Sequence, residues 1–169
     1  MPEKILIVDD FPVFREGLKA LLSNVASLEV IGEAENGEIA VTKTNLLRPD
    51  LILMDLVMPV LNGIDATRSI KQLYSDIKVL ALAEQQSHDQ VRAAMAAGAN
   101  GYILKQDTTA SLLSAIECVL DGDEYLSPGV GDKVVSGSQA NDESIDNRSL
   151  WLKSTSRGRK CLSESDKKN

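Results

Sequence analysis

Five short apolar runs alternate with helix-like segments along residues 4–122, and this alternation limits the fold more than any other feature of the sequence. The runs are ILIV (5–8), LEVIGEA (28–34), LILM (51–54), IKVLALA (77–83) and GYIL (101–104). Apolar residues recur at helical spacing after the first run, at Phe14, Leu18, Leu21, Leu22 and Val25,. Repeated strand–helix alternation predicts a parallel sheet covered by helices on both faces. We therefore predict an α/β fold with a doubly wound, five-stranded parallel sheet.

The character of each run predicts its place in that sheet. The runs at 5–8, 51–54 and 77–83 are almost continuously apolar, as expected of strands that are buried on both faces,. The run at 28–34 alternates more and suits an edge. This pattern fits the strand order 2-1-3-4-5, which is known from flavodoxin-like sheets and is adopted here from them. In such sheets, ligands bind outside the carboxyl ends of the strands.

Charged residues stand at those predicted carboxyl ends. They are Asp9, Asp10, Asp55 and Lys105. Three neighbouring carboxylates repel one another, so they need cations beside them. The lysine supplies one positive charge, and a ligand set limited to oxygen favours a hard divalent ion, Mg²⁺ above all.

The motifs that carry these residues resemble the receiver domain of two-component response regulators. The matching segments are VDD (8–10), DLVMPVLNG (55–63) and GANGYILK (98–105). The resemblance covers residues 4 to about 128. Within receivers, DDFPVFREGLKALL and DGDEYLSPGV (121–130) are similar to the NarL/FixJ-like branch, whose members usually carry a helix-turn-helix output domain.

The resemblance implies a role for each residue of the site. Asp55 is the implied phosphoacceptor,. Mg²⁺ is bound by Asp10, Asp55 and the backbone carbonyl of Val57, and by Asp9 through water,. Lys105 pairs first with Asp55 and then with a phosphoryl oxygen,.

Two positions near the acceptor need separate comment. Gly63 is expected to permit a backbone conformation that other residues resist,. Receivers usually have Thr or Ser at the end of the fourth strand, where this chain has Ala83. Alanine offers no hydroxyl to a phosphoryl group, so inward rotation of the switch residue Tyr102 is expected to be less favoured in the phosphorylated protein.

Two functions from different classes remain open. One is a receiver in phosphorelay signal transduction that switches partner binding or transcriptional output. The other is a receiver-fold protein-binding module that works without phosphorylation, which Ala83 favours. The complete acidic set favours the first, because clustered carboxylates are costly to retain without a use.

The implied partners follow from the same resemblance. A histidine kinase or a phosphotransfer protein donates the phosphoryl group, and homodimerisation through the receiver domain is an option. The chain is not expected to be an enzyme beyond self-phosphorylation and self-dephosphorylation. No apolar run approaches the roughly 18 residues of a membrane span, and the first predicted strand leaves no room for a signal peptide. We therefore predict a cytoplasmic protein without a membrane partner.

A change of composition divides the chain into a receiver domain, residues 1–128, and a polar linker with a basic tail, residues 129–169. Residues 1–146 carry 11 Lys and Arg against 23 Asp and Glu, whereas residues 147–169 carry 7 against 2. The tail has almost no apolar stripe, so we predict disorder and no DNA-binding output domain. A basic arm that contacts nucleic-acid phosphates is the alternative. Origin of the tail by truncation or frameshift, the cognate kinase and the output target stay open.

Overall fold

The computed structural model describes residues 1–128 and residue 130. The predicted receiver domain, 1–128, falls inside this range, and the predictions for the linker and tail lie outside the described residues apart from residue 130. Within the described range, no helix has the length and apolar character needed to cross a membrane.

In the described part of the chain, six parallel strands form one sheet in the order β2-β1-β3-β4-β5-β6. The strands are β1 (Glu3–Val8), β2 (Leu28–Ala34), β3 (Leu51–Asp55), β4 (Lys78–Ala83), β5 (Gly101–Leu104) and β6 (Tyr125–Leu126). The order confirms the predicted doubly wound sheet and the edge position of β2. The sixth strand is an addition to the five predicted, because two residues are too few to give a periodic signal.

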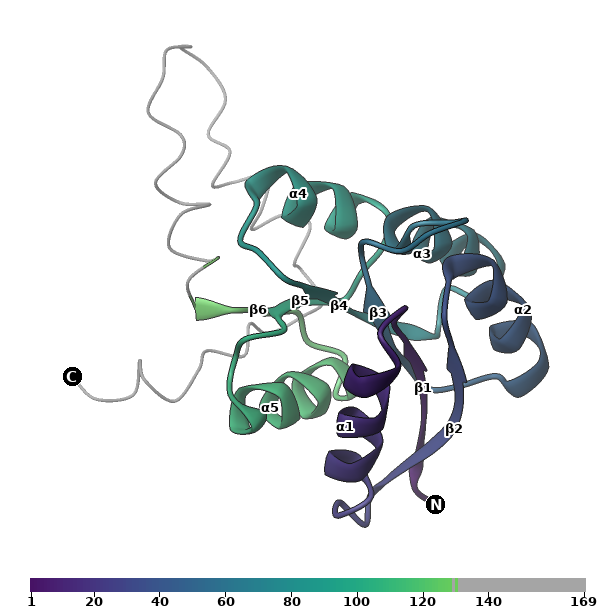
Figure 1. Ribbon diagram of the computed structural model, residues 1–169, viewed down its shortest axis with the longest axis vertical. Helices are drawn as coiled ribbons and strands as arrows, with labels where there is room; N and C mark the ends of the chain where they lie inside the picture. The colour runs from purple at the N-terminus through teal and green to yellow at the C-terminus, as the bar shows by residue number, and fades with distance from the viewer. Residues whose placement is uncertain (129, 131–169) are drawn as a thin grey trace.

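Helices connect successive strands and cover both faces of the sheet. They are α1 (Pro12–Leu22), α2 (Gly37–Leu47), α3 (Gly63–Leu73), α4 (His88–Ala96) and α5 (Thr109–Leu120). Figure 1 shows α1 and α5 on one face, with α2, α3 and α4 on the other. This arrangement leaves the loops that follow the strands together at one edge.

Alternation along each strand supplies apolar side chains to both layers. From β1, Ile5 and Ile7 pack with α1 and α5, whereas Leu6 and Val8 pack with α2 and α3. All four are fully buried. Full burial of such a side chain contributes about 1.5–3 kcal/mol. The central strands are therefore packed from both sides, which fixes the positions of the charged residues at their ends.

The start of α1 differs from the starts of the other helices. The N-cap side chains of α2, α3, α4 and α5 each accept a backbone hydrogen bond; they are Asn36, Asn62, Ser87 and Thr108. The N-cap of α1 is Phe11, which has no side-chain acceptor, and Pro12 opens the helix,. The loop that carries the two N-terminal aspartates is therefore not fixed by an ordinary cap.

Candidate functional site

Three carboxylates meet at the carboxyl edge of the sheet, as the sequence predicts. Asp9 and Asp10 follow β1, and Asp55 is the last residue of β3. One carboxylate oxygen from each lies within 4.8 Å of the other two. Asp9 and Asp55 are buried, and Asp10 is partly exposed. Asp10 is therefore the member of the cluster most exposed to solvent.

Lys105, directly after β5, supplies the positive charge. Its Nζ lies 2.6 Å from Asp9 Oδ2 and 3.2 Å from Asp55 Oδ2. The predicted pair with Asp55 is thus present, but the closer partner is Asp9. The ammonium also lies 4.8 Å from the centre of the Phe14 ring, close enough for a cation–π contact,.

The pKa of Asp55 is shifted upward, which is unusual for a carboxylate next to a lysine. Burial and the neighbouring Asp9 carboxylate raise the pKa of Asp55 to about 6, and Lys105 only partly opposes them,. For Lys105, burial by itself lowers the pKa, but the Asp9 and Asp55 carboxylates outweigh burial and the net shift is upward. The site therefore holds more negative charge than its single lysine balances.

The chemistry of the donor set fits a divalent, oxygen-binding ion. With its carboxylates ionised, the cluster carries three negative charges against one positive charge. Its donors are oxygen atoms, which Mg²⁺ prefers. The Asp9 oxygens are already engaged, because Oδ1 accepts a hydrogen bond from the Phe11 backbone (2.8 Å) and Oδ2 faces Lys105. The Asp55 oxygens likewise face the Val57 N–H and Lys105, so the partly exposed Asp10 is the carboxylate most accessible to a metal ion.

The loop after Asp55 is held tightly against β3. A Cβ atom at Gly63 would lie 1.9 Å from the Asp55 carbonyl oxygen, so only glycine permits this approach. Among the described glycines, positive φ occurs at Gly98 and Gly122 and not at Gly63. The prediction that Gly63 supplies conformational freedom is therefore wrong, and the reason for the glycine is steric. Val57, the predicted backbone ligand, donates its N–H to Asp55 Oδ1 (3.2 Å).

Ala83 and Tyr102 belong to one buried cluster, in which the neighbour of Tyr102 on β4 is Ala81. Ala83 ends β4, and its carbonyl accepts a hydrogen bond from the Lys105 backbone N–H (2.7 Å). The Tyr102 ring is fully buried, and its hydroxyl donates to the Gln85 carbonyl (3.2 Å). The inward position of Tyr102 is thus occupied here although position 83 offers no hydroxyl. The expected outward preference concerns the phosphorylated protein and stays a prediction.

Sequence reasoning missed Arg15 and Gln85. Arg15 donates from Nη1 to the Asp9 carbonyl (2.6 Å) and from Nε to Glu33 Oε1 (3.2 Å). A signal for it was present, since Arg15 precedes Leu18 and Leu22 by three and seven residues on the buried stripe of α1,. Gln85 accepts through its backbone carbonyl, which every residue type carries, so the sequence gives no signal for this contact.

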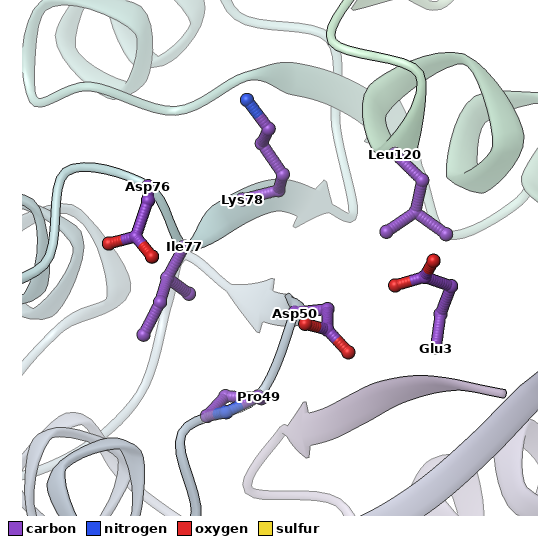
Figure 2. A pocket seen from close by; sticks show the side chains of 7 residues that line it. All are labelled: Glu3, Pro49, Asp50, Asp76, Ile77, Lys78 and Leu120. Atoms are coloured by element: carbon purple, nitrogen blue, oxygen red, sulfur yellow. The ribbon is translucent and has the colours of Figure 1, made fainter. Parts of the chain in front are cut away.

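A cavity lies at the opposite edge of the sheet, away from this chemistry. Figure 2 shows its lining, which comes from the starts of β1 and β4, the residues before β3 and the end of α5. Its volume is about 180 Å³, and its acidic residues are Glu3, Asp50 and Asp76. Asp50 is used structurally, because its Oδ2 accepts the Lys4 backbone N–H (2.8 Å). We therefore assign the functional site to the aspartate cluster and not to the cavity.

A doubly wound parallel sheet with three aspartates and a lysine at its carboxyl edge defines the class of receiver domains. Residues 5–117 match the family described as the response regulator receiver domain, and the chain belongs to this family.

Its relatives are response regulators of the LuxR/NarL type, which confirms the predicted branch. The transcriptional regulatory protein DegU of Brevibacillus brevis is 39% identical over 132 residues, covering 78% of this chain and 56% of that protein. The response regulator GacA of Pseudomonas syringae pv. syringae is 34% identical over 146 residues, covering 85% and 68%. A LuxR-family response regulator from Aurantimonas has a solved structure with TM-score 0.78 and 32% identity, covering 81% of this chain and 98% of that one. The chain thus spans little more than half the length of DegU.

Proposed function

We propose that this receiver accepts a phosphoryl group on Asp55 in an Mg²⁺-dependent reaction, and that the modification switches partner binding or transcriptional output. The observation that carries the proposal is the convergence of three carboxylate oxygens within 4.8 Å beside Lys105.

The proposed reaction is a transfer between an acidic nucleophile and a phosphorylated donor. An Asp55 carboxylate oxygen forms a bond to phosphorus while the bond between phosphorus and the donor breaks. The donor's leaving group departs with the bonding electrons and takes up a proton, and Asp55 becomes an acyl phosphate. Lys105 turns from Asp55 toward a phosphoryl oxygen and stabilises its charge.

Three further residues hold the site during this transfer. Mg²⁺ would be held by Asp10, Asp55 and the Val57 carbonyl, and Asp9, which is fully buried against Phe11 and Lys105, would act through water. When bound, the ion would supply positive charge beside the transferred oxygens. The Val57 N–H, which donates to Asp55 Oδ1, orients the nucleophile.

The test is phosphorylation of the full chain by a small acyl phosphate, followed by intact mass measurement. The wild type gains one phosphoryl group in the presence of Mg²⁺ and none after chelation. Asp55→Asn gains none. Asp50→Asn serves as the matched control, because Asp50 precedes the same strand at its other end, and it behaves as the wild type. Phosphate on another aspartate, or uptake by Asp55→Asn, contradicts the proposal.

A second candidate function is a binding module that works without phosphorylation. The inward Tyr102 favours it, since its hydrogen bond to the Gln85 carbonyl is made without a hydroxyl at position 83. A partner that binds wild type and Asp55→Asn equally, with or without phosphodonor, supports this function. A partner whose affinity depends on phosphodonor supports the first.

The proposed partners are those of a two-component pathway. A histidine kinase or a phosphotransfer protein donates the phosphoryl group in the cytoplasm, and the receiver is not an enzyme beyond its own phosphorylation and dephosphorylation. Homodimerisation through the receiver is a further proposal. DNA binding by residues 129–169 is not proposed, because their sequence shows no recognisable output domain.

A further inference from the structure

The side chain of Arg15 joins three elements near the metal-binding aspartates. It leaves α1, donates from Nη1 to the Asp9 carbonyl at 2.6 Å, and donates from Nε to Glu33 Oε1 on β2 at 3.2 Å. Only 15% of the side chain is exposed. An arginine held by two directional bonds and shielded from solvent is fixed in place, and it fixes what it contacts.

The group that Arg15 contacts controls the direction of Asp10. The Asp9 carbonyl and the Asp10 N–H belong to the same planar peptide unit. Holding that carbonyl therefore sets the orientation of the unit and, with it, the direction in which the Asp10 side chain leaves the chain. The N-cap residue Phe11 has no side-chain acceptor, so Arg15 shares this task only with Asp9 Oδ1, which accepts the Phe11 N–H at 2.8 Å.

Glu33 in turn holds the guanidinium. Its carboxylate also pairs with Lys19 Nζ at 2.8 Å, one turn further along α1. The pKa of Glu33 is lowered, first by the hydrogen bond from Lys19, with Arg15 adding to it against the effect of burial. Glu33 is thus anionic at neutral pH. Lys19 shares this partner and makes no contact with the Asp9 carbonyl, so it provides a matched control.

We propose that Arg15 is a positioning residue that sets the affinity of the site for Mg²⁺ by orienting the Asp9–Asp10 peptide. The proposal rests on the proposed function, since it assigns Asp10 to the metal. A purely electrostatic role predicts the opposite sign, because removing a cation beside a cation site strengthens binding of the metal. A purely structural role, bracing α1 against β2, predicts lower stability with unchanged affinity.

The test compares Mg²⁺ affinity in Arg15→Met, Arg15→Lys and Lys19→Met, measured on the full chain without phosphodonor. Amide signals of residues 9–11 and 55–57 report Mg²⁺ binding, and thermal unfolding is followed on the same samples. Loss of a residue that orients a metal ligand typically weakens metal binding by about 10–100-fold, so Arg15→Met is expected at the lower end, about tenfold. Arg15→Lys keeps the charge but loses the two-bonded geometry, so it weakens binding to an intermediate extent. Lys19→Met leaves the dissociation constant within about twofold of the wild type, because it alters only a partly exposed pair that does not contact the Asp9 carbonyl,.

Two results overturn the proposal. One is unchanged or tighter Mg²⁺ binding by Arg15→Met, which reduces Arg15 to a structural or electrostatic role while the wild type still binds Mg²⁺. The other is full restoration of affinity by Arg15→Lys, which shows that the two-bonded geometry of Arg15 is not required. Failure of the proposed function is recognised separately, because the wild type itself then gives no saturable Mg²⁺ response. In that case the proposed role of Arg15 is also wrong.

Discussion

Asp55→Asn is expected to stabilise the metal-free protein at neutral and alkaline pH. The side chain is buried beside Asp9, and these two causes raise the pKa of Asp55 from 3.8 to about 6. An asparagine has nearly the same shape and carries no charge. The substitution therefore removes an unfavourable buried charge while leaving the packing of β3 intact.

The size of the effect follows from linkage between protonation and folding. The pKa of Asp55 is higher in the folded protein than in the unfolded chain, so protonated Asp55 favours folding at low pH. This contribution to the free energy of unfolding is complete below the unfolded pKa and is lost as pH rises through about 6,. Each pKa unit corresponds to about 1.36 kcal/mol, so the full shift corresponds to about 3 kcal/mol at most. Because Asp55 interacts with both Asp9 and Lys105, we expect about 1–3 kcal/mol in favour of Asp55→Asn at pH 8. For a domain of this size, that is a rise of about 3–10 °C in Tm.

Thermal unfolding in chelator, measured from about pH 5 to about pH 8, tests this reasoning. The advantage of Asp55→Asn shrinks toward pH 5, because the wild-type carboxyl is then mostly protonated in the folded state. Saturating Mg²⁺ raises Tm for the wild type more than for the variant. Glu29→Gln, which alters an exposed carboxylate on the edge strand β2, changes little at any pH. An Asp55→Asn variant no more stable than the wild type at pH 8, or an advantage independent of pH, would refute the assigned burial cost.

Three further predictions concern the neighbours of Asp55. Asp10→Asn raises the Mg²⁺ dissociation constant by about tenfold or more in an amide-shift titration, because it removes a proposed ligand. Gly63→Ala lowers the free energy of unfolding by about 1–3 kcal/mol and reduces phosphorylation, because its Cβ would lie 1.9 Å from the Asp55 carbonyl oxygen,; unfolding and intact mass measure both effects. Ala83→Thr adds a hydroxyl that can bond a phosphoryl group, which favours the switched state by about ten- to a hundredfold. Amide shifts at residues 83–90 and Tyr102 on phosphorylation are therefore larger in that variant than in the wild type, and equal shifts in the two proteins contradict this prediction.

The sequence by itself determined the elements, the strand character and the acidic set. Strand and helix periods are local properties, so the apolar runs located five strands and placed the run at 28–34 at an edge. Parallel strands have their carboxyl ends at one edge of the sheet, so the sequence also predicts that four charged residues lie close together: Asp9, Asp10, Asp55 and Lys105,. The shortest strand, β6, escaped this reasoning because it pairs with β5 without a pattern of its own.

The tertiary structure decided how those residues contact one another. Lys105 lies closer to Asp9 than to Asp55, and Gly63 is required by a close approach to β3 and not by its φ angle. Arg15 bonds to Glu33, 18 residues away along the chain. Each of these facts depends on ångström-scale packing between elements that the sequence does not connect locally. Periodicity identifies the face on which a side chain lies, but only the packed fold determines which atom it reaches.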